Sequence, residues 1–109
     1  MEGKPKESDW KTFRKMVPEL RERYLTEKNK EIAAIFMDES RTPTQRFWDA
    51  RERIEKERKI LQACLDGHSR SKMEWYMRLM YRHGMLSDPD LENFTEDLSD
   101  DIKHGSRSL

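Results

Sequence analysis

Apolar residues recur along this chain at spacings of three and four, and no stretch alternates with the period of a β-strand. The first periodic set consists of Trp10, Phe13, Val17, Leu20 and Tyr24. It predicts an amphipathic helix that Ser8 or Asp9 would cap. Pro18 interrupts the set, so either a short helix ends at Met16 and another begins, or one helix is kinked. We favour the kink, because Val17 is a poor cap for a second helix.

Further along the same helix, the apolar residues lie on a different face. Residues 26–31 are all polar, after which apolar residues resume at Ile32, Ala34, Ile35, Phe36 and Met37. This second group is rotated relative to the first, so one straight partner could not cover both. We therefore expect the first helix to contact two different surfaces along its length.

The second helix has the clearest boundaries in the sequence. Thr42, Pro43 and Gln45 form a capping box with proline at the first helical position, and Gly67 follows the expected end at about Leu65. Its predicted apolar stripe is Phe47, Ala50, Ile54, Leu61 and Leu65. Opposite charges four residues apart, at Arg51/Glu55, Glu52/Lys56 and Glu55/Lys59, predict an exposed side.

The third helix is predicted over residues 73–81, where seven of nine residues are apolar or aromatic. Ser69 or Ser71 would cap it, and Gly84 would end it. One face carries Met73, Tyr76, Met77 and Met80, and another carries Trp75 and Leu79. A helix that is apolar around so much of its circumference is normally enclosed by other helices or by a partner.

The fourth helix is predicted to open at Asp88 and Pro89 and to end at Gly105. It places Leu91, Phe94, Leu98 and Ile102 on one narrow face among seven acidic residues. This face would cover the protein's own core, although it could instead dock in a groove of another protein. The fold class is therefore all-α: a long antiparallel helical hairpin with two shorter C-terminal helices packed on it, as a three- to four-helix bundle. Residues 8–104 would form one domain, between a disordered lead (1–7) and a loose tail (105–109).

The composition favours assembly and an intracellular location. Hydrophobic residues make up 34% of the 109 residues and charged residues 40%, so apolar surface is scarce, and oligomerisation is the usual remedy. Lys plus Arg equals Asp plus Glu at 22 each, so no net field attracts nucleic acid or membrane. Cys64 is the only cysteine, and no window approaches the ~18 apolar residues of a membrane span. We expect a cytoplasmic protein without a membrane partner.

No pattern predicts catalytic, cofactor-binding or metal-ligating residues, and we do not expect an enzyme. Cys64 and His68 are four apart, but Gly67 should break the helix between them. His83 and His104 stand at predicted helix ends, where a protonated imidazole interacts well with the last carbonyls. The four glycines form no phosphate loop, and no Glu-x-x-His spacing occurs.

The methionine-rich third helix supplies the functional hypothesis. Methionine side chains adapt to varied partners, and residues 73–85 hold four of the seven. We expect a protein-interaction or regulatory module that forms a homodimer, or binds another protein, through this helix. The predicted partner-binding residues are Trp48, Trp75, Leu79, Arg78 and Arg82.

The alternative hypothesis is a DNA-binding regulator of helix-turn-helix type over residues 60–82. Ala63 and Gly67 resemble the small residue and the turn glycine of that motif. Nucleic acid would then contact Arg70, Lys72, Arg78 and Arg82. Residues 87–104 are strongly acidic, however, so the basic and acidic helices could simply be neighbours that neutralise one another.

Overall fold

The computed structural model describes residues 6–105, in which helices are joined by short connections and no strand occurs. The elements are α1 (Glu7–Phe36), α2 (Pro43–Leu65), the 3-10 turn η1 (Arg70–Lys72), α3 (Met73–Arg82), α4 (Asp88–Leu91) and α5 (Glu96–Gly105). The predicted all-α fold with a long helical hairpin is confirmed. Of the predicted lead and tail, residues 1–5 and 106–109 lie outside the described residues.

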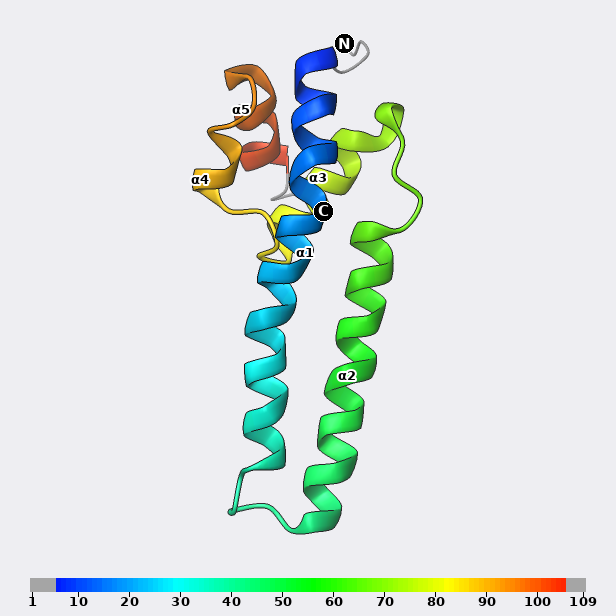
Figure 1. Ribbon diagram of the computed structural model, residues 1–109, viewed down its shortest axis with the longest axis vertical. Coiled ribbons are helices and arrows are strands. Elements are labelled where there is room, and N and C mark those ends of the chain that lie inside the picture. Colours follow the sequence, from blue (N-terminus) through cyan, green and yellow to red (C-terminus); the bar gives the residue numbers. More distant parts are fainter. Residues whose placement is uncertain (1–5, 106–109) are drawn as a thin grey trace.

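The hairpin extends well beyond the rest of the domain. α1 and α2 run antiparallel along the long axis of a molecule whose extents are 53 × 23 × 21 Å (Figure 1). α3, α4 and α5 gather around the N-terminal half of α1 and the C-terminal end of α2. At the opposite end α1 and α2 contact only each other among the described residues.

The core follows this division. Phe13, Leu20 and Tyr24 are the buried apolar residues of α1, and all three precede residue 25. They belong to one cluster with the buried residues of the covered end: Cys64, Met73, Met77, Met80, Met85, Leu86, Leu91, Phe94, Leu98 and Ile102. In α2, Ala50 and Glu57 are the only buried residues before Cys64. Within residues 6–105, the distal half of the hairpin therefore has no third layer.

α1 is one helix from Glu7 to Phe36, with Pro18 inside it, which excludes the alternative of two separate helices. Pro18 is exposed, so water can satisfy the carbonyl that its missing N–H leaves free. The predicted cap is wrong: Lys6 occupies the N-cap position without a side-chain hydrogen bond. Asp9 is instead buried, and there it accepts hydrogen bonds from the backbone N–H (2.9 Å) and the hydroxyl (2.7 Å) of Thr95.

The predicted limits of α2 are confirmed. The Thr42 hydroxyl accepts a hydrogen bond from the Gln45 N–H at 3.1 Å, and the Gln45 side chain accepts one from the Thr42 N–H at 2.8 Å. α2 ends at Leu65, and Gly67 adopts a φ of 77° in the left-handed region. Such a backbone is adopted readily by glycine alone, so the chain turns there towards η1.

α3 begins at Met73 and ends just before Gly84, as the sequence predicted, but its predicted serine cap is wrong. Gly84 has a φ of 78°, and the next N–H, of Met85, donates to the Met80 carbonyl at 2.8 Å. This arrangement closes the helix. Neither predicted serine caps α3, because η1 precedes it and Lys72 holds its N-cap position without a side-chain hydrogen bond.

The predicted fourth helix is divided into α4 and α5. Ser87 and Asp90 form a capping box for α4, and the Asn93 side chain donates to the Asp90 carbonyl at 3.0 Å, which ends the helix after one turn. The next helix, α5, begins just after Thr95, whose backbone N–H and hydroxyl donate hydrogen bonds to Asp9 of α1. All four predicted apolar residues, Leu91, Phe94, Leu98 and Ile102, are nevertheless buried. Because they face the core of the same chain, the fourth segment covers its own domain.

Candidate interaction surface

Most of the large hydrophobic side chains that the structure leaves exposed belong to the distal hairpin. Within residues 6–105 the exposed set is Phe36 (46%), Met37 (77%), Phe47 (55%), Trp48 (56%), Ile54 (48%) and Trp75 (52%). Five of the six lie between positions 36 and 54. A concentration of this kind marks an interaction surface more often than scattered single residues do.

One side of the hairpin carries a row of apolar side chains from each of the two helices. On α2, Phe47, Ile54 and Leu61 are seven residues apart and lie in one line along the helix. On α1, Leu25 and Ile32 are likewise seven apart. We call this surface the hairpin face and define it by seven side chains: Leu25, Ile32, Phe36, Phe47, Ile54, Leu61 and Leu65.

At the base of the hairpin face the two helices form a shallow groove. Its apolar lining is Leu25, Leu61 and Leu65, and its polar rim is Arg21, Arg58, Gln62 and Asp66. These residues come from both helices, so the groove shows that the stripes of α1 and α2 open to the same side. All three leucines are only partly buried.

The opposite side of the distal hairpin is charged. Arg53 of α2 forms ion pairs with Glu31 of α1 and, at 2.9 Å, with Glu57. Lys28 approaches Glu31 at 3.6 Å. The hairpin therefore has one apolar side and one ionic side. The charged groups of the ionic side pair with one another, whereas the apolar side chains are left exposed to water.

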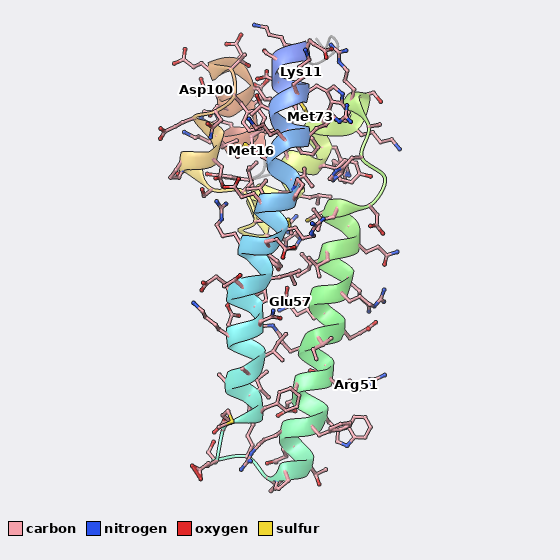
Figure 2. All side chains as sticks on the ribbon, in the orientation of Figure 1. Lys11, Met16, Arg51, Glu57, Met73 and Asp100 are labelled. Carbon is pink, nitrogen blue, oxygen red and sulfur yellow. The ribbon has the colours of Figure 1, made fainter. Side chains whose placement is uncertain are left out.

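The two helices are joined at mid-length by a polar contact. The Tyr24 hydroxyl donates to Glu57 at 2.5 Å, and both residues are buried. Figure 2 shows Glu57 between α1 and α2. Burial opposes ionisation of this carboxyl, but hydrogen bonds from Tyr24 and Arg53 outweigh it, so the Glu57 pKa lies below its usual value. Burial and the same contact raise the pKa of Tyr24, which stays a neutral donor.

The tip of the hairpin is built to hold its shape. The Arg46 Nε–H donates to the carbonyls of Asp38 (2.8 Å) and Arg41 (3.1 Å), and the Arg41 side chain contacts Asp38 at 3.2 Å. With the Thr42 capping box, these bonds fix the direction in which α2 leaves the turn. The aromatic residues of the tip are thus presented from an ordered support.

An aromatic pair stands on this support. The rings of Phe47 and Trp48 meet edge to face with centroids 5.0 Å apart. The Arg51 guanidinium lies 6.0 Å from the Trp48 ring. Figure 2 shows Arg51 on the side of α2 that faces away from α1. Tryptophan and arginine are enriched among the residues that dominate binding energy at protein interfaces.

The structure does not bring the predicted partner-binding residues together. Trp48 lies at the hairpin tip, whereas Trp75, Arg78, Leu79 and Arg82 lie on α3 at the other end of the molecule (Figure 1). Leu79 packs against the core, while Trp75 is half exposed. Met73, Met77 and Met80 are fully buried in their own chain. Of the large hydrophobics of α3, only Trp75 is exposed.

The basic residues of the nucleic-acid alternative are partly engaged within the protein. Arg70 forms an ion pair with Glu7 at 2.7 Å, and Arg78 forms one with Glu74. Lys72 and Arg82 are exposed. α3 and α5 are neighbours, as the neutralisation hypothesis requires, although these two ion pairs are made with α1 and within α3. The helix-turn-helix hypothesis stays a prediction.

His68, His83 and Cys64 contact other parts of the fold and form no reactive cluster with one another. His68 contacts the Cys64 carbonyl at 2.7 Å, and its ring packs edge to face against Phe13 and Tyr76. Burial raises the pKa of the Cys64 thiol to about 11. His83 occupies the C-cap of α3, but burial, and secondarily Arg82, lower its pKa, which disfavours the predicted charged role. Among residues 6–105, no three potential ligands converge on a metal position.

The residues that sequence reasoning missed are those of the distal apolar stripe. Phe47 and Ile54 were expected in a buried stripe with Ala50, yet only Ala50 of the three is buried, because no third helix of residues 6–105 reaches this end. The available signal was the rotated apolar group after residue 31, from which we predicted a second surface on α1. Phe36 and Ile32 belong to that group.

Comparison with known proteins finds no matching family model, no matching curated protein and no matching solved structure. Over the described part of the chain, no helix has the length and hydrophobicity needed to cross a bilayer. Fold and surface together define an all-α protein with a half-covered helical hairpin.

Proposed function

We propose that this protein is an interaction module whose binding surface is the hairpin face. The observation that carries the proposal is the pairing of a covered end, which has its own core, with a distal end that exposes Phe36, Phe47 and Ile54 on an ordered hairpin. Three large side chains exposed in one stripe do not stabilise the monomer. Their burial against a partner would stabilise the complex by about 25 cal/mol for each Å² of apolar surface removed from water.

The hairpin is a better binding surface than α3, because it exposes more apolar side chains. α3 uses its methionines in the internal core and exposes Trp75, whereas the hairpin exposes several neighbouring residues and has a groove beside them. A role in assembly also suits a chain without a convergent set of chemical groups on its described surface. We place the module in the cytoplasm, because its only cysteine is a buried free thiol, as reducing compartments allow.

The test is fractionation of a native lysate by size. The unaltered protein is expected to elute above the position of a 13.2 kDa chain, and the triple variant Phe36→Ser, Phe47→Ser, Ile54→Ser is expected to elute as a monomer with an unchanged helical circular dichroism spectrum. Trp75→Ser is the matched control and should elute with the unaltered protein. Elution of the unaltered protein as a monomer, or identical elution of the triple variant, would refute the proposed function.

A further inference from the structure

We propose that the occupant of the hairpin face is a second copy of this chain, stacked antiparallel so that the two hairpins form a four-helix bundle. This inference rests on the proposed function and names its partner. Two antiparallel helices with one apolar and one charged side are half of such a bundle, and a second identical half completes it. A twofold axis brings the same surface of each copy together, and twofold symmetry is the commonest symmetry among soluble oligomers.

The size of the surface fits a dimer. Buried aromatic residues each remove roughly 150–250 Å² from water, so the half-exposed residues of the hairpin face, its partly buried leucines and the neighbouring Trp48 leave on the order of 500 Å² of apolar surface open. A standard interface buries about 800 Å² on each partner, of which roughly 60% is apolar. The hairpin face together with Trp48 therefore supplies about the apolar area that one side of a stable dimer needs.

The charges also suit self-association. Residues 29–56 contain six basic residues (Lys30, Arg41, Arg46, Arg51, Arg53, Lys56) and six acidic residues (Glu31, Asp38, Glu39, Asp49, Glu52, Glu55). Two such ends meet without net repulsion. A surface for nucleic acid or for an anionic lipid headgroup would need an excess of Lys and Arg, and this end has none.

The antiparallel arrangement follows from the spacing along α2. Ile54 lies seven residues after Phe47 and seven before Leu61, so it marks the middle of the stripe. With the twofold axis near Ile54, Phe47 of each copy reaches the groove lined by Leu25, Leu61 and Leu65 of the other, and Trp48 packs against Phe47 at the edge of the contact. Phe47 then fills the groove, whose rim carries Arg21 and Arg58 for contact with its aromatic face.

Sedimentation velocity of the purified full chain over a hundredfold range of concentration tests the proposal. A dimer of twice 13.2 kDa is expected at micromolar concentration, and Ile54→Glu or the more conservative Phe47→Ser should weaken dimerisation at least tenfold while circular dichroism stays unchanged. Trp75→Glu, a like substitution of a half-exposed residue on α3, should leave the dimer intact. A monomer throughout the range would overturn the proposal. If the lysate assembly still depends on the hairpin face, the partner is a different protein and the proposed function stands.

The orientation has its own test, because the native Cys64 is buried and does not interfere. Under mild oxidation Ile54→Cys is expected to give a covalent dimer, since the two positions meet at the axis. Phe47→Cys should not, because the two tips are at opposite ends of the bundle. Efficient cross-linking of Phe47→Cys alone would show a tip-to-tip arrangement and overturn the antiparallel proposal.

Discussion

Replacing Glu57 with alanine is expected to destabilise the protein by about 3–5 kcal/mol, because the substitution removes the acceptor shared by Tyr24 and Arg53 at mid-hairpin. Each hydrogen bond to a buried charged group contributes roughly 1.5–3 kcal/mol, and the Tyr24 hydroxyl would be left buried without its acceptor. The total stability of a domain of this size is only about 5–15 kcal/mol, so the loss is large.

Urea unfolding at pH 7, followed by circular dichroism, measures this loss as a lower midpoint at an unchanged m-value. Glu57→Gln should lie between the alanine variant and the unaltered protein, since the amide oxygen still accepts from Tyr24 but the charge opposite Arg53 is gone. Glu55→Ala is the matched control: Glu55 pairs with Arg58 at 2.7 Å on the surface, and its loss should leave the midpoint almost unchanged.

The same variant has a predictable pH dependence. The pKa of Glu57 is lower in the folded protein than the value of about 4.3 for a free glutamate, so its contribution is complete above that value and is lost as the pH falls through the folded pKa. The difference between Glu57→Ala and the unaltered protein should therefore shrink below about pH 4. A loss under about 1 kcal/mol at pH 7, or a difference that does not change with pH, would refute the assigned role of the Tyr24–Glu57–Arg53 contact.

Four further predictions concern the covered end. Asp9→Ala should cost about 2–3 kcal/mol in urea unfolding, since it frees the N-terminus of α5, whereas an equal loss in Lys11→Ala would argue against this specific contact. Asp90→Asn should cost about 1–2 kcal/mol of unfolding free energy at pH 7 and less at pH 3, because hydrogen bonds from Arg23 and Ser87 overcome desolvation and lower the Asp90 pKa. The same difference between variant and unaltered protein at both pH values would contradict this. Gly84→Ala should cost about 1–2 kcal/mol through its positive φ, despite open space around the added Cβ, and no change in the unfolding midpoint would contradict the strain. Met77→Ala should lower stability by about 2–5 kcal/mol through a core cavity, and a smaller loss than that of Met37→Ala would place the core elsewhere.

The helices and their ends were largely predictable because their signals are local. The Thr42 capping box, Gly67 and Gly84 act within a few residues of one another, and the structure places each where the pattern indicated. Local signals also gave the buried face of the fourth segment. They could not show its division, because α5 begins where Asp9, 86 residues earlier in the chain, holds Thr95.

The candidate surface was predictable only in part, since exposure depends on where the third layer ends. An apolar residue at helical spacing has the same signature whether another helix covers it or not, so Ala50 and Ile54 looked alike. The structure separates them: Ala50 is buried between the helices, and Ile54 faces outward at 48% exposure. Trp48 and Trp75 were grouped together because both stand outside a stripe, yet a hairpin longer than the remaining helices carries them to opposite ends.

The accessibility of residue 54 tests most directly whether the hairpin face is a binding surface. In an Ile54→Cys variant, kept reduced, the new thiol is exposed on a free chain, while the buried Cys64 reacts slowly. Alkylation followed by mass spectrometry should be fast in dilute solution and at least tenfold slower at micromolar protein or in native lysate, whereas a Trp75→Cys control should react equally fast throughout. Equal rates for Ile54→Cys under all three conditions would show that nothing covers the hairpin face and would contradict its role in binding.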